Sequence, residues 1–91
     1  MIIGDIIYSK KFIKRFKKLP KNIAKKAIET EKIFKANPLH PSIRLHELHG
    51  DLKKYWSISI NRKYRIIFKQ KSDGNIYFIF IGNHNIYDAL K

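Results

Sequence analysis

A chain of 91 residues has room for one domain with one modest core, and the absence of cysteine excludes both disulfides and thiolate metal sites. Hydrophobic residues make up 44% of the chain, which excludes general disorder, and no apolar run approaches the roughly 20 residues that cross a bilayer. The net charge of +13, from 20 Lys and Arg against seven Asp and Glu, favours an anionic partner, either nucleic acid or an acidic protein. The abundance of Lys, Ile and Asn is also what genome base composition could produce.

The first predicted element is a strand over residues 2–8, which are mostly isoleucine. This segment contains Asp5 and follows no basic region, so it does not resemble a signal peptide, and a cytoplasmic protein is expected. Ser9 is a suitable N-cap for a helix over residues 10–19. The apolar side chains of that helix recur at helical spacing: Phe12, Ile13, Phe16 and Leu19.

A second helix is predicted over residues 21–36, between Pro20 at its start and Asn37-Pro38 at its end. Its predicted inner stripe consists of Ile23, Ala24, Ala27, Ile28 and Phe34. The two helices carry 11 of the 20 basic residues, so their outer face is strongly positive. That face is either simply solvated or part of a binding surface.

The rest of the chain has the two-residue period of strands. Strands are predicted over residues 43–48, 55–60, 64–68 and 76–82, with turns at 49–51, 61–63 and 72–75. In the second of these strands Trp56, Ile58 and Ile60 share one face.

The predicted fold is therefore α+β, a single domain of residues 1–91 in which a strand and two helices precede three or four antiparallel strands, a β-α-α-β-β-β type of order. The helical hairpin packs on a small antiparallel sheet and covers the face that carries Trp56, Ile58 and Ile60. The other face, which carries Ser57, Ser59 and Arg65, is expected to be open and able to seat a nucleic-acid strand.

The sequence lacks a glycine-rich phosphate loop, a nucleophile elbow and clustered carboxylates for magnesium. The segment His46-Glu47-Leu48-His49 runs from a predicted strand into a turn, and histidines three residues apart there would face opposite sides, so no metal or cofactor is expected. The remaining groups suit metal-free RNA cleavage, which needs a base, an acid and a cation at the phosphate. His46, His84 and Arg65 are the candidates for these roles, although His84 could also be an ordinary loop residue.

Three further residues are candidates for RNA binding. Lys53 and Lys54 precede the aromatic strand and are either phosphate contacts or solvated turn residues. Tyr87 either packs the C-terminal tail or stacks on a base.

Three segments together resemble the RelE/ParE superfamily of toxins. Residues 44–60, RLHELHGDLKKYWSISI, are similar to the central segment of these toxins, in which a leucine, a glycine and a lysine precede an aromatic-rich strand. YRIIF at residues 64–68 resembles the next strand, with Arg65 in the family position. IGNHNIY at residues 81–87 is similar to the C-terminal glycine-x-histidine ending of one RelE-like branch.

The resemblance implies the toxin of a type II toxin–antitoxin system, commonly a ribosome-dependent mRNA endonuclease that an antitoxin neutralises. The antitoxin would be acidic and encoded adjacently. By position, Arg65 would contact the scissile phosphate and His84 would be an acid or base, with His46 as the other proton-transfer group. Lys53 and Lys54 would bind RNA. Tyr87 would also bind RNA, although its position corresponds least closely to a family position.

Two departures leave the acid–base assignment open. His84 stands where one branch has an arginine, and Ser59 stands where some relatives have a histidine. The alternatives are a non-enzymatic inhibitor of DNA gyrase like the ParE branch, or an accessory RNA- or ribosome-binding protein.

Overall fold

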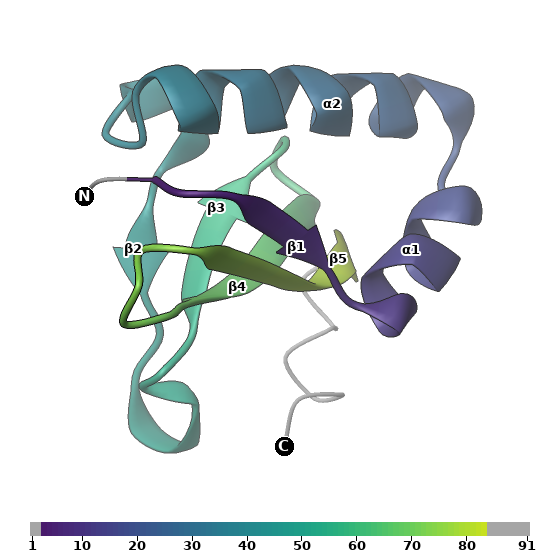
Figure 1. Ribbon diagram of the computed structural model, residues 1–91. Coiled ribbons are helices and arrows are strands. Elements are labelled where there is room, and N and C mark those ends of the chain that lie inside the picture. The colour runs from purple at the N-terminus through teal and green to yellow at the C-terminus, as the bar shows by residue number, and fades with distance from the viewer. Residues whose placement is uncertain (1–2, 84–91) are drawn as a thin grey trace.

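In the computed structural model, which describes residues 3–83, two helices pack against one side of a five-stranded sheet (Figure 1). The elements are β1 Ile6–Tyr8, α1 Lys10–Lys17, α2 Lys21–Ala36, β2 His46–Glu47, β3 Trp56–Ser59, β4 Tyr64–Gln70 and β5 Ile76–Asn83. The predicted α+β class and element order are confirmed. No helix among residues 3–83 has the length and apolar character that spanning a membrane requires.

Local signals explain where both helices begin. The Ser9 hydroxyl accepts a hydrogen bond from the Phe12 N–H at 2.9 Å, so it caps α1, and it donates to the Ile79 carbonyl oxygen in β5 at 2.8 Å. Pro20 precedes α2, whose bounds agree with the prediction. α1 ends at Lys17, before the predicted end of that helix.

The sheet has the strand order β1-β5-β4-β3-β2. β1 runs parallel to β5, with Ile6 opposite Ile76, and all other neighbouring strands are antiparallel. The connection between the parallel strands contains both helices and the strands β2, β3 and β4, which is long enough for a parallel pair. The prediction of a small antiparallel sheet therefore holds for four strands and misses the parallel pairing of β1, which is also shorter than the predicted 2–8.

The predicted strand over residues 43–48 is wrong except at His46–Glu47. Pro41–Ile43 forms a 3-10 turn, and Arg44 follows it with a left-handed backbone, φ 48° and ψ 51°. A left-handed residue cannot continue a strand, so pairing with β3 starts only at His46. A second 3-10 segment, Gly50–Leu52, overlaps the turn predicted at residues 49–51.

The main core lies between the helices and one face of the sheet. Its buried side chains are Phe12, Ala27, Phe34, Ile43, Ile58, Ile60, Ile66, Phe68, Ile76, Phe78 and Ile81, and Trp56 packs against them. The predicted placement of Trp56, Ile58 and Ile60 under the helices is thus confirmed.

The predicted helix stripes are wrong at two isoleucines. Ile13 is 43% exposed and Ile28 is 47% exposed. The buried stripe of α2 instead contains Ile23, Ala27, Thr30 and Phe34, a regular helical spacing of four, three and four residues. Thr30 belongs in this stripe because its hydroxyl donates to the Lys26 carbonyl oxygen at 2.8 Å and needs no other partner.

We call the sheet face that turns away from the helices the far face. Strand alternation puts Ser57, Ser59 and Arg65 on it, as predicted. The prediction that this face is open is wrong, because a second cluster of Leu48, Leu52, Ile67 and Phe80 covers part of it. Ser57 is 0% exposed, Ser59 is 6% exposed and Arg65 is half-buried.

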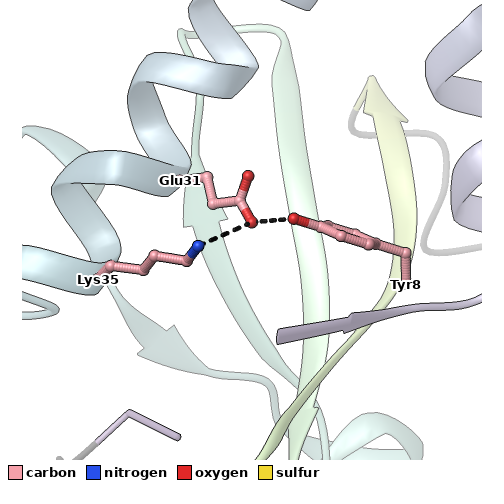
Figure 2. A network of polar contacts seen from close by, with 3 residues as sticks. All are labelled: Tyr8, Glu31 and Lys35. Carbon is pink, nitrogen blue, oxygen red and sulfur yellow. Dashed lines mark hydrogen bonds and ion pairs between the residues drawn. The ribbon is translucent and has the colours of Figure 1, made fainter. Parts of the chain in front are cut away.

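A polar contact ties β1 to α2. Figure 2 shows the Glu31 carboxylate between the Tyr8 hydroxyl, which donates a hydrogen bond to it, and the Lys35 ammonium at 4.0 Å. Burial, followed by this hydrogen bond and the charge of Glu31, raises the pKa of Tyr8 from its ordinary value near 10 to about 12.

Candidate functional site

Arg65 is on the far face of β4, the middle strand of the sheet, near the β3–β4 turn. It lies on β4 opposite Ser59 of β3 and Gly82 of β5. Its Nη1 donates hydrogen bonds to the carbonyl oxygens of Asn61 and Tyr64, the second at 3.1 Å. The guanidinium is therefore held at the β3–β4 turn. Within residues 3–83 its other N–H groups make no hydrogen bond, so they remain able to bind an anion.

His46 shares the far face with Arg65. Residues directly opposite in an antiparallel pair point to the same face, and His46 lies opposite Ser57. Ser59, two residues further along β3, lies opposite Arg65. The Cα atoms of His46 and Arg65 are thus about 10 Å apart across the strands and about 7 Å apart along them.

A backbone carbonyl fixes the proton arrangement of His46. The Arg44 carbonyl oxygen lies 2.9 Å from Nδ1 of this exposed imidazole. A carbonyl oxygen can only accept, so Nδ1 must carry the proton. In the neutral ring Nε2 is then the unprotonated nitrogen, and it makes no hydrogen bond to any of residues 3–83. This arrangement suits a general base.

The other sequence candidates have different positions. His84 and Tyr87 lie outside the described residues. The last described positions, Gly82 and Asn83, are paired with Arg65 and Tyr64. The main chain that leads to His84 is therefore next to Arg65.

Lys53 and Lys54 are exposed and lie just before β3. Ser59, the position opposite Arg65, is at the other end of that strand. Five residues of extended chain span roughly 17 Å, so the structure does not bring these lysines to Arg65.

Two basic residues of α1, which are not among the predicted site residues, reach the far face. The Lys11 ammonium and the Arg15 guanidinium each lie 5.1 Å from the centre of the Phe80 ring. Arg15 also lines a pocket of ≈ 210 Å³ together with Gly82 and Asn83. The signal in the sequence is their spacing of four residues, which puts them on one helix face. Whether that helix face turns toward the sheet or toward solvent depends on how α1 packs along β5.

The described residues contain no metal centre. Among residues 3–83, no three side chains of His, Cys, Asp or Glu are arranged so that they could hold a metal ion. What the far face offers is a fixed guanidinium, an imidazole with a defined tautomer and two further cations from α1. These groups can bind a phosphate and accept a proton.

Comparison of the structure with solved structures finds the same fold in several toxins. YafQ from E. coli strain BL21(DE3) is 24% identical with a TM-score of 0.75, covering 91% of this chain and 96% of that chain. The toxin–antitoxin complex RelBE2 from Mycobacterium tuberculosis contains a chain that is 14% identical to this one, with a TM-score of 0.74. The match covers 91% of this chain and 100% of that chain. The YoeB–YefM complex from Staphylococcus aureus gives 24% identity and a TM-score of 0.71, covering 88% and 95%.

Sequence comparison gives the family. No curated protein matches the chain. The model of the HigB-like toxin family, described as the RelE-like toxin of the type II toxin–antitoxin system HigB, matches residues 7–84. That match includes both helices and every strand except the first residue of β1. The chain belongs to the HigB-like family of RelE-like toxins of type II toxin–antitoxin systems.

Proposed function

We propose that this toxin is a metal-independent endoribonuclease that cuts mRNA on the ribosome, in the cytoplasm, and so stops translation. The proposed partner that neutralises it is an acidic antitoxin encoded beside it. Two of the similar structures are complexes of a toxin with an antitoxin, RelBE2 and YoeB–YefM, and the charge of +13 on this chain suits an acidic partner.

The observation that carries the proposal is the common face of His46 and Arg65. A general base and a phosphate-binding cation on one side of a sheet are two of the three groups that metal-free RNA cleavage needs. The third, a general acid, is assigned to His84 from the family resemblance.

In the proposed reaction Nε2 of His46 takes the proton of the ribose 2′-hydroxyl. The 2′-oxygen then forms a bond to phosphorus, and the bond from phosphorus to the 5′-oxygen breaks. His84 gives a proton to the departing 5′-oxygen, and Arg65 stabilises the charge that grows on the phosphate oxygens. The products are a 2′,3′-cyclic phosphate and a 5′-hydroxyl end, and no water is consumed.

A translation extract with a defined mRNA tests the proposal. The 5′ ends are mapped after addition of the wild type or of the variants His46→Ala, Arg65→Ala and His84→Ala. Cleavage of the mRNA is expected for the wild type. The rate should fall about 10²-fold or more in each variant, as for the loss of a proton-transfer group or of a charge-stabilising donor.

His49→Ala is the matched control, because His49 is an exposed histidine three residues from His46. Its rate should equal that of the wild type. Intact mRNA with the wild type would overturn the proposal. If supercoiling by DNA gyrase were then blocked, the toxin would instead act like the ParE branch, and the absence of growth arrest on expression would indicate an accessory binding protein.

A further inference from the structure

A pocket of ≈ 240 Å³ opens beside the outer edge of β3, away from the centre of the far face. β2 pairs only with Trp56 and Ser57, so the outer edge of β3 beyond Ser57 has no strand partner among residues 3–83. The middle of α2, the segment Ser42–Arg44 and the β3–β4 turn form the walls. The volume would hold roughly eight water molecules at about 30 Å³ each, enough for a phosphate with part of its sugar.

The walls carry an excess of positive charge. Lys26, Arg44, Arg62 and Arg65 line the pocket, and Glu29 is the one carboxylate among the lining residues. The ion pair within residues 3–83 joins Lys35 to Glu31, so none of these four cations is paired with a carboxylate in that range. Uncompensated cations around a concave site attract an anion.

The composition of the pocket favours phosphate. Three of its four cations are arginines, whose planar N–H forks match phosphate oxygens. Arg65 is held by the Asn61 and Tyr64 carbonyl oxygens, so this guanidinium is already ordered before a ligand binds.

Two residues connect the pocket to the far face. Arg65 lines the pocket and stands on β4 opposite Ser59 and Gly82. Arg44 lines the pocket, and its carbonyl oxygen accepts the hydrogen bond of His46 Nδ1. An RNA strand whose cleaved linkage lies between His46 and Arg65 can therefore continue over the edge of β3 into the pocket.

We propose that this edge pocket binds a backbone phosphate of the RNA strand, next to the linkage that is cut. The inference rests on the proposed ribonuclease function and adds a substrate-binding site to it. The pocket would hold the strand in register, and the base and the cation of the far face would act on the neighbouring linkage.

The test measures binding without cleavage. A short fluorescein-labelled RNA in which every 2′-hydroxyl is methylated cannot be cut, because the attacking group is blocked. Its dissociation constant is measured by fluorescence anisotropy over a series of KCl concentrations. The pocket variant is Lys26→Ala with Arg62→Ala, and the matched control is Lys25→Ala with Lys63→Ala. Both remove the same charge from adjacent positions, and all four side chains are exposed.

The pocket variant should bind the RNA about tenfold more weakly than the control variant, as for the loss of a charged hydrogen bond. Its plot of log affinity against log salt should be shallower by about 0.7, the value for one phosphate contact of a single strand. Thermal denaturation should give equal midpoints for both variants.

Two results would overturn the inference. If both variants weakened RNA binding equally, the general positive charge of the surface would hold the RNA. If the pocket variant weakened the binding of RNA and of a polyglutamate chain equally, the pocket would bind an acidic protein. A wild type that binds the methylated RNA but never cuts mRNA would instead refute the proposed function and leave the pocket in place.

Discussion

Arg44 has the one left-handed backbone among the non-glycine residues in the range 3–83. Such a conformation costs about 1–2 kcal/mol for a residue with a Cβ and persists only where the surroundings enforce it. Here it turns the Arg44 carbonyl oxygen toward His46 and ends the 3-10 turn that precedes β2. A strained residue thus positions the base of the proposed reaction.

Substitutions at Arg44 test this role. Arg44→Gly should leave the free energy of unfolding unchanged or raise it by up to about 1 kcal/mol, because glycine relieves the strain but adds freedom to the unfolded chain. Arg44→Val should lower it by about 1–3 kcal/mol, because a β-branched residue tolerates this region poorly. Urea denaturation measures both. Equal stability of the two variants would show that the left-handed backbone is not enforced.

At the residue scale, the sequence predicts which side chains share a face of the sheet better than it predicts the backbone conformation of single residues. The common face of His46 and Arg65 follows from strand alternation and from the turn between β3 and β4. The left-handed Arg44 does not follow, because arginine has no preference for that region. The hydrogen bond that defines the tautomer of His46 could therefore only be seen in the structure.

At the scale of the elements, β1 and α2 are joined by the hydrogen bond from Tyr8 to Glu31 (Figure 2). The folded state raises the pKa of Tyr8 to about 12, so it holds the phenol proton more tightly than the unfolded chain does. The contribution to stability is therefore complete below pH 10 and is lost as the pH rises through about 12.

Tyr8→Phe should destabilise the protein by about 1 kcal/mol at pH 8, the usual net value of a hydrogen bond. The difference from the wild type should shrink as the pH is raised from about 10 to about 12. Urea denaturation at several pH values measures it. Tyr77→Phe is the control, because within residues 3–83 the Tyr77 hydroxyl makes no hydrogen bond, and a similar pH trend there would contradict the assignment.

The sequence predicts the elements well where both ends carry a local signal. α2 is bounded by Pro20 and by Asn37-Pro38, so its limits could be predicted to the residue. The exposure of Ile28 could not, because several neighbouring registers of the apolar stripe fit the sequence and only packing selects one. The partial cover of the far face by Leu48 and Leu52 likewise depends on how the loop after β2 folds back.

At the scale of the whole molecule, the net charge of +13 on a chain of 91 residues opposes folding by self-repulsion. Raising the ionic strength from about 0.1 M to about 1 M shortens the screening length from about 10 Å to about 3 Å. The melting temperature should therefore rise with NaCl. In a domain of this size, each kcal/mol added to the free energy of unfolding raises the melting temperature by about 4–8 °C.

Calorimetry of the wild type and of a variant with Lys21, Lys25 and Lys32 changed to Gln checks this prediction. The three side chains are exposed on α2, so the variant removes charge without disturbing the core. Its melting temperature should respond less to NaCl. A melting temperature that is independent of salt in both proteins would show that the positive charges are too far apart to repel one another.

The charge also shows what composition alone cannot predict. An anionic partner follows from the excess of Lys and Arg, but the places where cations gather do not. Lys11 and Arg15 meet the far face only because α1 lies along β5, where the Ser9 N–H donates to the Phe78 carbonyl oxygen. Lys26 and Arg62 line the same pocket only in the folded chain.

The parallel pairing of β1 with β5 has a consequence for synthesis of the toxin. β5 lies between β1 and β4, so the sheet cannot close until this last strand has left the ribosome. A nascent chain that stops before Ile76 leaves β1 unpaired and lacks the β5 side chains of both hydrophobic clusters. Translation products that end before Ile76 should therefore fail to fold and have no toxin activity.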